Sequence, residues 1–147
     1  MGITFQKEKF VDVMGELPEL LVRHHHEVSR DGAVPLNFNF KKYIALENLG
    51  MYHVMTVRTD GKLVGYGLCL LNESLHDQKI WGYCNLYLAE ENRSPWLFLK
   101  LARKVDEMVK GLGAIGNHMG THPKKDISVL YERLGYTLEE MIFFKSY

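Results

Sequence analysis

The apolar positions of the chain repeat with two periods, one typical of strands and one typical of helices. Alternation at residues 3–5 predicts a short strand. Residues 16–32 predict a helix, because their apolar side chains recur at helical spacing, Pro18 suits a first turn and Gly32 suits an end. A second, shorter helix is predicted over residues 40–50. The stripe of the first helix consists of Leu17, Leu20, Leu21, His24 and Val28.

Three strands follow, with the alternation that a half-buried sheet requires. Residues 51–59 and 62–71 are joined by Asp60-Gly61, a dipeptide that favours the positive backbone angles of a tight hairpin turn. Residues 79–89 form a third predicted strand after a polar loop. Together the three segments predict an antiparallel meander.

The clearest helix begins at residue 95 and ends near residue 112. Its apolar side chains fall on one face and its charged side chains on the other. Ser94 is a good N-cap residue, and Pro95 is a good first helical residue. The apolar face consists of Leu97, Phe98, Leu101, Val105, Met108, Val109 and Leu112.

The remaining third of the chain alternates between strand and helix patterns. A strand is predicted over residues 114–120, a helix over residues 127–134 that ends at Gly135, and a last strand over residues 136–147. The whole order predicts one α/β domain over residues 1–147. Its mixed, mostly antiparallel sheet is expected to be flanked by about four helices.

Composition and charge exclude several classes of protein. The 147 residues are 46% hydrophobic, and 18 Lys and Arg residues balance 18 Asp and Glu residues, which leaves no basic excess for a nucleic acid. No apolar run approaches the roughly 20 residues of a membrane span, and the first ten residues lack the features of a secretion signal. Cys69 and Cys84 lack metal-binding or redox spacing, which favours a reducing compartment. We therefore expect a cytoplasmic protein that binds neither nucleic acid nor membrane.

Several short sequence segments occur in an order and at spacings that are informative about the family of the protein. LVGYG lies in the predicted hairpin, LYLAEENR enters the long helix, and LYERLGY lies near the end, while HHHEV, PLNFNFKKY and SLH occur between and before them. In this order they resemble the GNAT superfamily of acyl-CoA-dependent N-acyltransferases, most of all its short bacteriophage-encoded members. The resemblance covers nearly the whole chain. It implies a GNAT-like fold, an acetyl-CoA or CoA ligand, and, for a phage-encoded chain, a place in the host cytoplasm.

The resemblance also implies roles for particular residues. A backbone N–H on the strand before the long helix is expected to stabilise the tetrahedral oxyanion, and Leu86 to Leu88 occupy that position, so Leu86 and Leu88 are candidate ligands of the thioester. Tyr131 is the candidate acid that protonates the departing thiolate. The residues alone support a second interpretation of Tyr131, because it lies on the apolar stripe of its helix, where a tyrosine usually belongs to the core.

The turn before the long helix departs from the family pattern. In the family, Arg or Gln, two variable residues, Gly, another variable residue and Gly or Ala form a turn whose backbone N–H groups hold the CoA pyrophosphate. Arg93 matches the first position, but Trp96 and Phe98 replace small residues and Pro95 lacks an N–H group. The expected CoA ligands here are Arg93, Ser94 and the amides of Trp96, Leu97 and Phe98. The sequence therefore predicts a degenerate pyrophosphate loop.

The seven histidines suggest a base rather than a metal ligand. Residues 24–26 are consecutive on a helix and point in different directions, and no cysteine or carboxylate completes a tetrahedral set, so no metal site is predicted. His76, in the loop before the third strand of the meander, is the first candidate for a general base, because imidazole titrates near neutral pH. Glu27 and His118 are the alternatives.

Two functions remain open from the sequence, besides a plain scaffold or dimerisation module that no sequence feature of its own favours. In the first, the chain transfers an acyl group from acetyl-CoA or a related thioester to an amine. In the second, it is a catalytically weak or inactive phage-type protein that binds and modulates a host enzyme, which the degenerate loop favours and for which Trp96 would suit an interface. In either case the last predicted strand, with Phe143 and Phe144, offers a surface for packing against a second copy in a homodimer.

Overall fold

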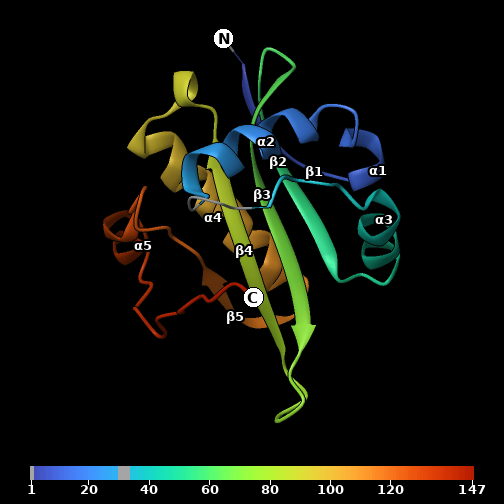
Figure 1. The fold of residues 1–147 in the computed structure, drawn as a ribbon, viewed down its shortest axis with the longest axis vertical. Coiled ribbons are helices and arrows are strands. Elements are labelled where there is room, and N and C mark those ends of the chain that lie inside the picture. The colour runs from blue at the N-terminus through green and yellow to red at the C-terminus, as the bar shows by residue number, and fades with distance from the viewer. Residues whose placement is uncertain (1, 30–33) are drawn as a thin grey trace.

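The computed structural model describes residues 2–29 and 34–147. Its centre is a five-stranded sheet in which the strands follow one another in chain order (Figure 1). The first four strands are antiparallel neighbours, whereas the fifth runs parallel to the fourth. The strands are β1 (Ile3–Glu8), β2 (Tyr52–Thr59), β3 (Lys62–Glu73), β4 (Ile80–Leu88) and β5 (Ala114–Met119).

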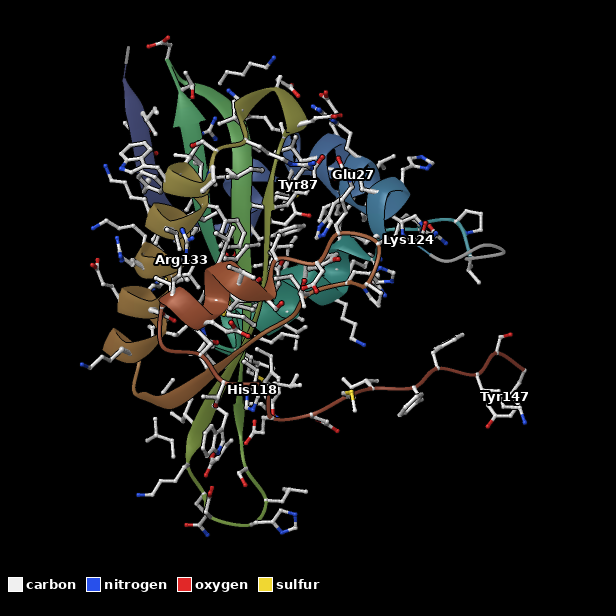
Figure 2. The ribbon with its side chains drawn as sticks, turned by 90° about the vertical axis from the view of Figure 1, so that its left-hand side faces the viewer. Glu27, Tyr87, His118, Lys124, Arg133 and Tyr147 are labelled. Atoms are coloured by element: carbon white, nitrogen blue, oxygen red, sulfur yellow. The ribbon has the colours of Figure 1, made fainter. Side chains whose placement is uncertain are left out.

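Helices cover both faces of the sheet, as the edge-on view in Figure 2 shows. One face carries α1 (Phe10–Val13), α2 (Leu17–Val28) and α3 (Phe40–Asn48). The other face carries α4 (Pro95–Gly111), and α5 (Ser128–Arg133) packs beside it. A single 3-10 turn, η1 (Glu90–Asn92), connects β4 to α4.

The core divides into two clusters, one on each face of the sheet, because successive strand residues point to opposite faces. On β3, Tyr66 is fully buried toward α2, whereas its neighbour Gly67 lies under α4. A Cβ atom at Gly67 would lie 2.4 Å from Cγ2 of Val105. Glycine at this position therefore lets α4 approach the sheet closely.

The strongest local signals of the sequence are confirmed. Asp60 and Gly61 both adopt positive φ angles, 48° and 84°, in the turn that joins β2 to β3. Ser94 caps α4, since its side chain accepts a hydrogen bond from the amide of Leu97, and Pro95 occupies the first helical position. The single α/β architecture with a mixed, mostly antiparallel sheet also agrees with the prediction.

The strand predicted over residues 136–147 is wrong, because this segment contains no regular element. Its apolar run has the composition of a strand, but a strand also requires a neighbouring strand to pair with, and the sequence pattern does not supply one. The sequence also misses α1, which has only four residues and therefore too few positions for a periodic pattern. Gly32, predicted to end the first helix, lies outside the described residues.

Two kinds of feature are absent from the described residues. No helix in this part of the chain combines the length and the apolar character that crossing a bilayer requires. Within residues 2–29 and 34–147, no group of three or more His, Cys, Asp or Glu side chains is placed to hold a metal ion. Cys69 and Cys84, directly opposite each other on β3 and β4, are buried and not bridged.

Candidate functional site

A cavity of about 720 Å³ lies between α2, the last residues of β4 and the first turn of α4. This volume is within the range that accommodates a small molecule. Its walls combine aromatic and apolar side chains with a few polar groups, as binding sites usually do. The residues that line it include His24, Glu27, Leu86, Tyr87, Leu88 and Arg93.

The cavity exists because β4 continues beyond its parallel neighbour. The pairing with β5 ends at Cys84 and Met119, so residues 85–88 have β3 on one side and the cavity on the other. The amide of Ala89 donates to Val64 on β3. Since alternate residues of a strand direct their backbone groups to opposite edges, the amides of Leu86 and Leu88 point to the open edge.

His24 is the most enclosed histidine of the cavity wall. Its Nδ1 lies 2.7 Å from the hydroxyl of Tyr66, and its ring stacks on Tyr87 with 4.7 Å between the ring centroids. Burial lowers the pKa of His24, and the nearby Glu27 carboxylate only partly opposes this effect. The imidazole is therefore held in its neutral form near neutral pH, and Nε2 is the ring nitrogen that Tyr66 leaves unused.

The carboxylate of Glu27, near His24, accepts hydrogen bonds from two side chains. The Tyr87 hydroxyl donates to Oε1 of Glu27 over 2.9 Å, and Nη2 of Arg93 donates to Oε2 over 2.5 Å. Burial raises the pKa of Glu27, but these two hydrogen bonds and the positive charges of Arg93 and Lys125 together lower it overall. Burial and the bond to Glu27 raise the pKa of Tyr87 to about 12. Figure 2 shows Glu27 on α2 and Tyr87 on β4 side by side.

Arg93 uses two of its three guanidinium nitrogens for contacts within the protein. Besides its ion pair with Glu27, its Nε donates to the carbonyl oxygen of Leu88 over 2.8 Å, and its guanidinium lies 5.3 Å from the ring centroid of Tyr87. The guanidinium fork that the sequence assigned to a phosphate is thus directed toward α2. A phosphate at this turn would have to compete with Glu27 for it.

A second ion pair ties α2 to the same turn. Both terminal nitrogens of Arg23 donate to the carboxylate of Glu91, at 3.1 and 2.6 Å. Arg23 and Glu27 are four residues apart on α2, so they lie on one face of that helix. The pair Arg23–Glu91 and the pair Glu27–Arg93 together fasten α2 above the β4–α4 connection.

The first turn of α4 offers few backbone donors. Pro95 has no N–H group, and the amide of Leu97 is already bonded to Oγ of Ser94 over 3.1 Å. The amide of Trp96 is therefore the remaining N–H among the first three helical residues. The Trp96 side chain is 59% exposed beneath Nζ of Lys100 and does not line the cavity, whereas Phe98 is buried in the core and contributes to the wall.

Tyr131 lies just behind the cavity wall. Its ring is buried against Phe98, with 5.7 Å between the ring centroids, and its hydroxyl donates to the carbonyl oxygen of Gly120 over 2.9 Å. Gly120 lines the cavity, whereas Tyr131 does not. Burial raises the pKa of Tyr131, so its hydroxyl keeps its proton at neutral pH.

His76 and His118, two of the candidate bases, do not line the cavity. His76 is exposed in the β3–β4 connection, which projects at the bottom of Figure 1, whereas the cavity lies at the far end of β4. His118 stacks on Tyr83, and its Nε2 lies 2.9 Å from Oε2 of Glu139. Of the candidate bases that the sequence offered, the structure brings only Glu27 into the site.

The fold of this chain matches solved structures, although its sequence matches no known family. No protein-family model matches the sequence, and no curated protein does. Solved structures match over nearly the full length. Ribosomal-protein-alanine N-acetyltransferase from Brucella melitensis biovar Abortus 2308 has a TM-score of 0.79 at 15% identity, covering 100% of this chain and 99% of that one. The chain has the fold of the N-acetyltransferases.

Two further structures support this assignment of the fold. Glucosamine-6-phosphate N-acetyltransferase from Arabidopsis thaliana has a TM-score of 0.76 at 15% identity and covers 100% of this chain and 99% of its own. An aminoglycoside acetyltransferase from an uncultured soil metagenomic sample, solved with sisomicin, has a TM-score of 0.73 at 14% identity, covering 99% and 95%. The GNAT-like architecture implied by the sequence resemblance is thereby confirmed at the level of the fold.

Within this N-acetyltransferase fold, three residues of the site were not singled out from the sequence. They are His24, Tyr66 and Tyr87, which meet although His24 and Tyr66 are 42 positions apart. One signal was present, because His24 shares the apolar stripe of its helix, and a histidine buried there requires a polar partner. The identity of that partner depends on how α2 packs on the sheet.

Proposed function

We propose that this protein transfers an acyl group from an acyl-CoA thioester to an amine. The observation that carries the proposal is that a neutral histidine and the open edge of β4 share one cavity. Acyl transfer requires a proton acceptor for the amine and fixed N–H donors for the oxyanion, and these two parts of the wall have those properties. The N-acetyltransferase fold supports the same reaction.

The thioester would lie along the open edge of β4. There the amides of Leu86 and Leu88 are the candidate donors to the carbonyl oxygen as it gains negative charge. For the CoA pyrophosphate, the candidate ligands are Ser94, the amide of Trp96 and Arg93. Because Arg93 is paired with Glu27 and Pro95 supplies no amide, we expect this part of the ligand to be held weakly.

The proposed reaction has two proton transfers, one from the attacking amine and one to the leaving thiolate. Nε2 of His24 accepts the proton of the amine as its nitrogen attacks the thioester carbonyl carbon. The C–N bond forms, the C–S bond breaks, and the sulfur leaves as a thiolate. Tyr131, whose hydroxyl would exchange its bond to the carbonyl oxygen of Gly120 for the sulfur, is the candidate donor that protonates this thiolate. The products are an amide and free CoA thiol, and the proton on His24 returns to Tyr131 through solvent, which restores both side chains.

A second candidate function is a binding role without efficient catalysis. The degenerate first turn of α4 favours it, because one donor is missing there and another is used by Ser94. In this alternative the chain, as a phage-type protein, would bind and modulate a host enzyme, with the exposed Trp96 as a contact residue. It predicts little or no turnover with any amine.

Two measurements on the purified protein separate the candidates. Isothermal titration with acetyl-CoA should give a dissociation constant in the micromolar to millimolar range, and release of free thiol should depend on an added amine. A panel should include a small primary amine, an amino sugar and a peptide with a free N-terminus. Binding without thiol release would support the binding role, and no binding at millimolar acetyl-CoA would refute acyl transfer.

A further inference from the structure

The open end of β4 divides the cavity into two parts, because alternate residues of a strand point to opposite faces of the sheet. Tyr87 lies on the side of α2, where it stacks on His24, whereas Leu86 packs in the core cluster beneath α4. The candidate base thus belongs to one part, and the turn proposed to bind CoA belongs to the other. The amine would occupy the part on the side of α2, because its proton passes to His24.

This part of the cavity, which we call the α2 chamber, has an apolar and aromatic wall. It is lined by Leu21 of α2, by Leu36 and Phe38 of the segment before α3, and by Tyr43 of α3. None of these side chains is fully buried, and Leu36 is 41% exposed, so the wall is accessible to a ligand. Figure 2 shows α2 and α3 next to each other on the same side of the sheet.

The two aromatic side chains of the α2 chamber are held in place by other rings. Phe38 stacks on Phe40, with 5.9 Å between the ring centroids and 12° between the ring planes. Tyr43 stacks on the fully buried Phe10 with 4.7 Å between the centroids, and Phe10 lies 6.1 Å from Phe40. The four rings therefore form one connected group. A flat ring that binds to a wall fixed in this way requires little reordering of the protein.

The charged groups of the cavity leave little to hold a second amino group. Among the described residues, the carboxylates that line the cavity are those of Glu27 and Asp126. Both oxygens of Glu27 accept hydrogen bonds, from Tyr87 and from Arg93, and Asp126 is exposed in the β5–α5 connection. Arg93 and Lys125 line the same cavity and would repel an additional ammonium group. A monoamine with an uncharged body fits these charges better than a polyamine.

We propose that the acceptor is a primary monoamine that carries an aromatic ring, and that the α2 chamber binds this ring against Phe38 and Tyr43. This inference rests on the acyl transfer proposed above. The amino nitrogen attacks the acyl carbon, its proton passes to His24, and CoA leaves with its sulfur. The product is therefore the N-acyl derivative of an aromatic amine.

The first test compares 2-phenylethylamine with propylamine, a primary amine that lacks the ring. Burial of the ring should make kcat/KM for thiol release about 30-fold higher with 2-phenylethylamine. Spermidine, a polyamine, should be a poorer acceptor than 2-phenylethylamine. Equal values for the two monoamines, or the highest value for spermidine, would overturn the proposal.

A substitution in the α2 chamber tests the wall itself. Phe38→Ala should reduce the preference for 2-phenylethylamine over propylamine about tenfold, because the ring then loses one of its aromatic contacts. Val34→Ala is the matched control, because Val34 lies in the same segment, is 77% exposed and does not line the cavity. It should leave the preference unchanged. Far-UV circular dichroism checks that both variants are folded, and an unchanged preference in a folded Phe38 variant would refute the ring site.

Binding measurements separate this inference from acyl transfer itself. In titration calorimetry, the purified protein should bind 2-phenylethylamine about tenfold more tightly than propylamine, and Phe38→Ala should remove most of this difference. Such binding without thiol release from any amine would refute acyl transfer but support the ring site. Thiol release with no preference for the ring, in turnover or in binding, would support acyl transfer and refute the ring site.

Discussion

The two walls of the cavity differ in how their polar groups are used. On the α2 wall, His24 and Glu27 have partners from β3, β4 and the following turn, and each partner fixes the side chain in place. On the α4 wall, Pro95 removes one backbone donor and Ser94 occupies another. One wall therefore holds its ionisable groups with partners from the sheet and the turn, whereas the other offers few unused backbone donors to an anion.

This difference separates the groups proposed for the chemical step from the groups proposed to bind CoA. His24, the candidate base, is positioned by its contacts with Tyr66 and Tyr87 of the sheet and not by the first turn of α4. Affinity for a phosphorylated ligand depends on that turn and on Arg93, which is directed toward Glu27. We therefore expect the chemical step and the binding of CoA to respond to different substitutions.

The largest expected effect comes from removing the candidate base. His24→Asn should lower kcat/KM for acyl transfer by about 100- to 10,000-fold, the range typical of a lost general base. Binding of acetyl-CoA, measured by titration calorimetry, should change little. His26→Asn is the control, because His26 is on the same helix but is exposed and does not line the cavity. Full activity of the His24 variant would remove it from the mechanism.

A smaller effect is expected from the candidate acid. Tyr131→Phe should lower turnover by about 100-fold while affinity for CoA stays the same, because the hydroxyl acts only on the departing thiolate. Single-turnover kinetics and calorimetry measure the two quantities separately. Unchanged turnover would mean that the hydroxyl serves only its bond to the carbonyl oxygen of Gly120.

The α4 wall can be tested by restoring its missing donor. Pro95→Ala returns an N–H group to the first helical residue, and one added hydrogen bond to a charged group should tighten CoA binding by about tenfold. Trp96→Gly is the informative comparison. The Trp96 side chain is exposed and outside the cavity, so its removal should change affinity less than the Pro95 substitution does. The reverse order would indicate that the indole obstructs the ligand.

The smallest expected effect is a decrease in the free energy of unfolding at mildly acidic pH. Because burial lowers the pKa of His24 in the folded protein, the unfolded chain binds a proton there more readily. The free energy of unfolding should therefore fall as the pH drops below about 6.5, the ordinary pKa of histidine. Glu27, whose folded pKa is lowered from 4.5, contributes only at lower pH. Denaturant titrations between pH 7 and 5.5 should show a shallower slope for His24→Asn, and an equal slope would contradict the assignment.

The parts of the fold that the sequence predicts are those determined by neighbouring residues. Asp60-Gly61 determines a turn, and Ser94 with Pro95 begins a helix, because these effects act within a few positions. The site is different. His24 meets its partner Tyr66 only when α2 packs on the sheet, whereas His76, chosen for its type and its loop, lies at the opposite end of β4 from the cavity.

The last residues of the chain show a second limit of prediction from sequence, because here a predicted strand is absent. Residues 136–147 have the composition of a strand, and the composition alone led to the wrong assignment within one chain. Strand formation depends on a neighbour, and a sequence pattern contains no information about whether that neighbour is present.

The two ion pairs between α2 and the β4–α4 connection alternate in sign. Arg23 of α2 pairs with Glu91 of the connection, and Glu27 of α2 pairs with Arg93 of the connection. Moving α2 along its axis by one turn, about 5.4 Å, would place like charges together. Charge therefore disfavours a shift of α2 by one turn, in addition to the burial of Leu17 and Leu20 in the core, and both keep His24 next to Tyr66. Exchanging Arg23 with Glu27 would reverse this preference, because like charges would then meet in the observed position of α2.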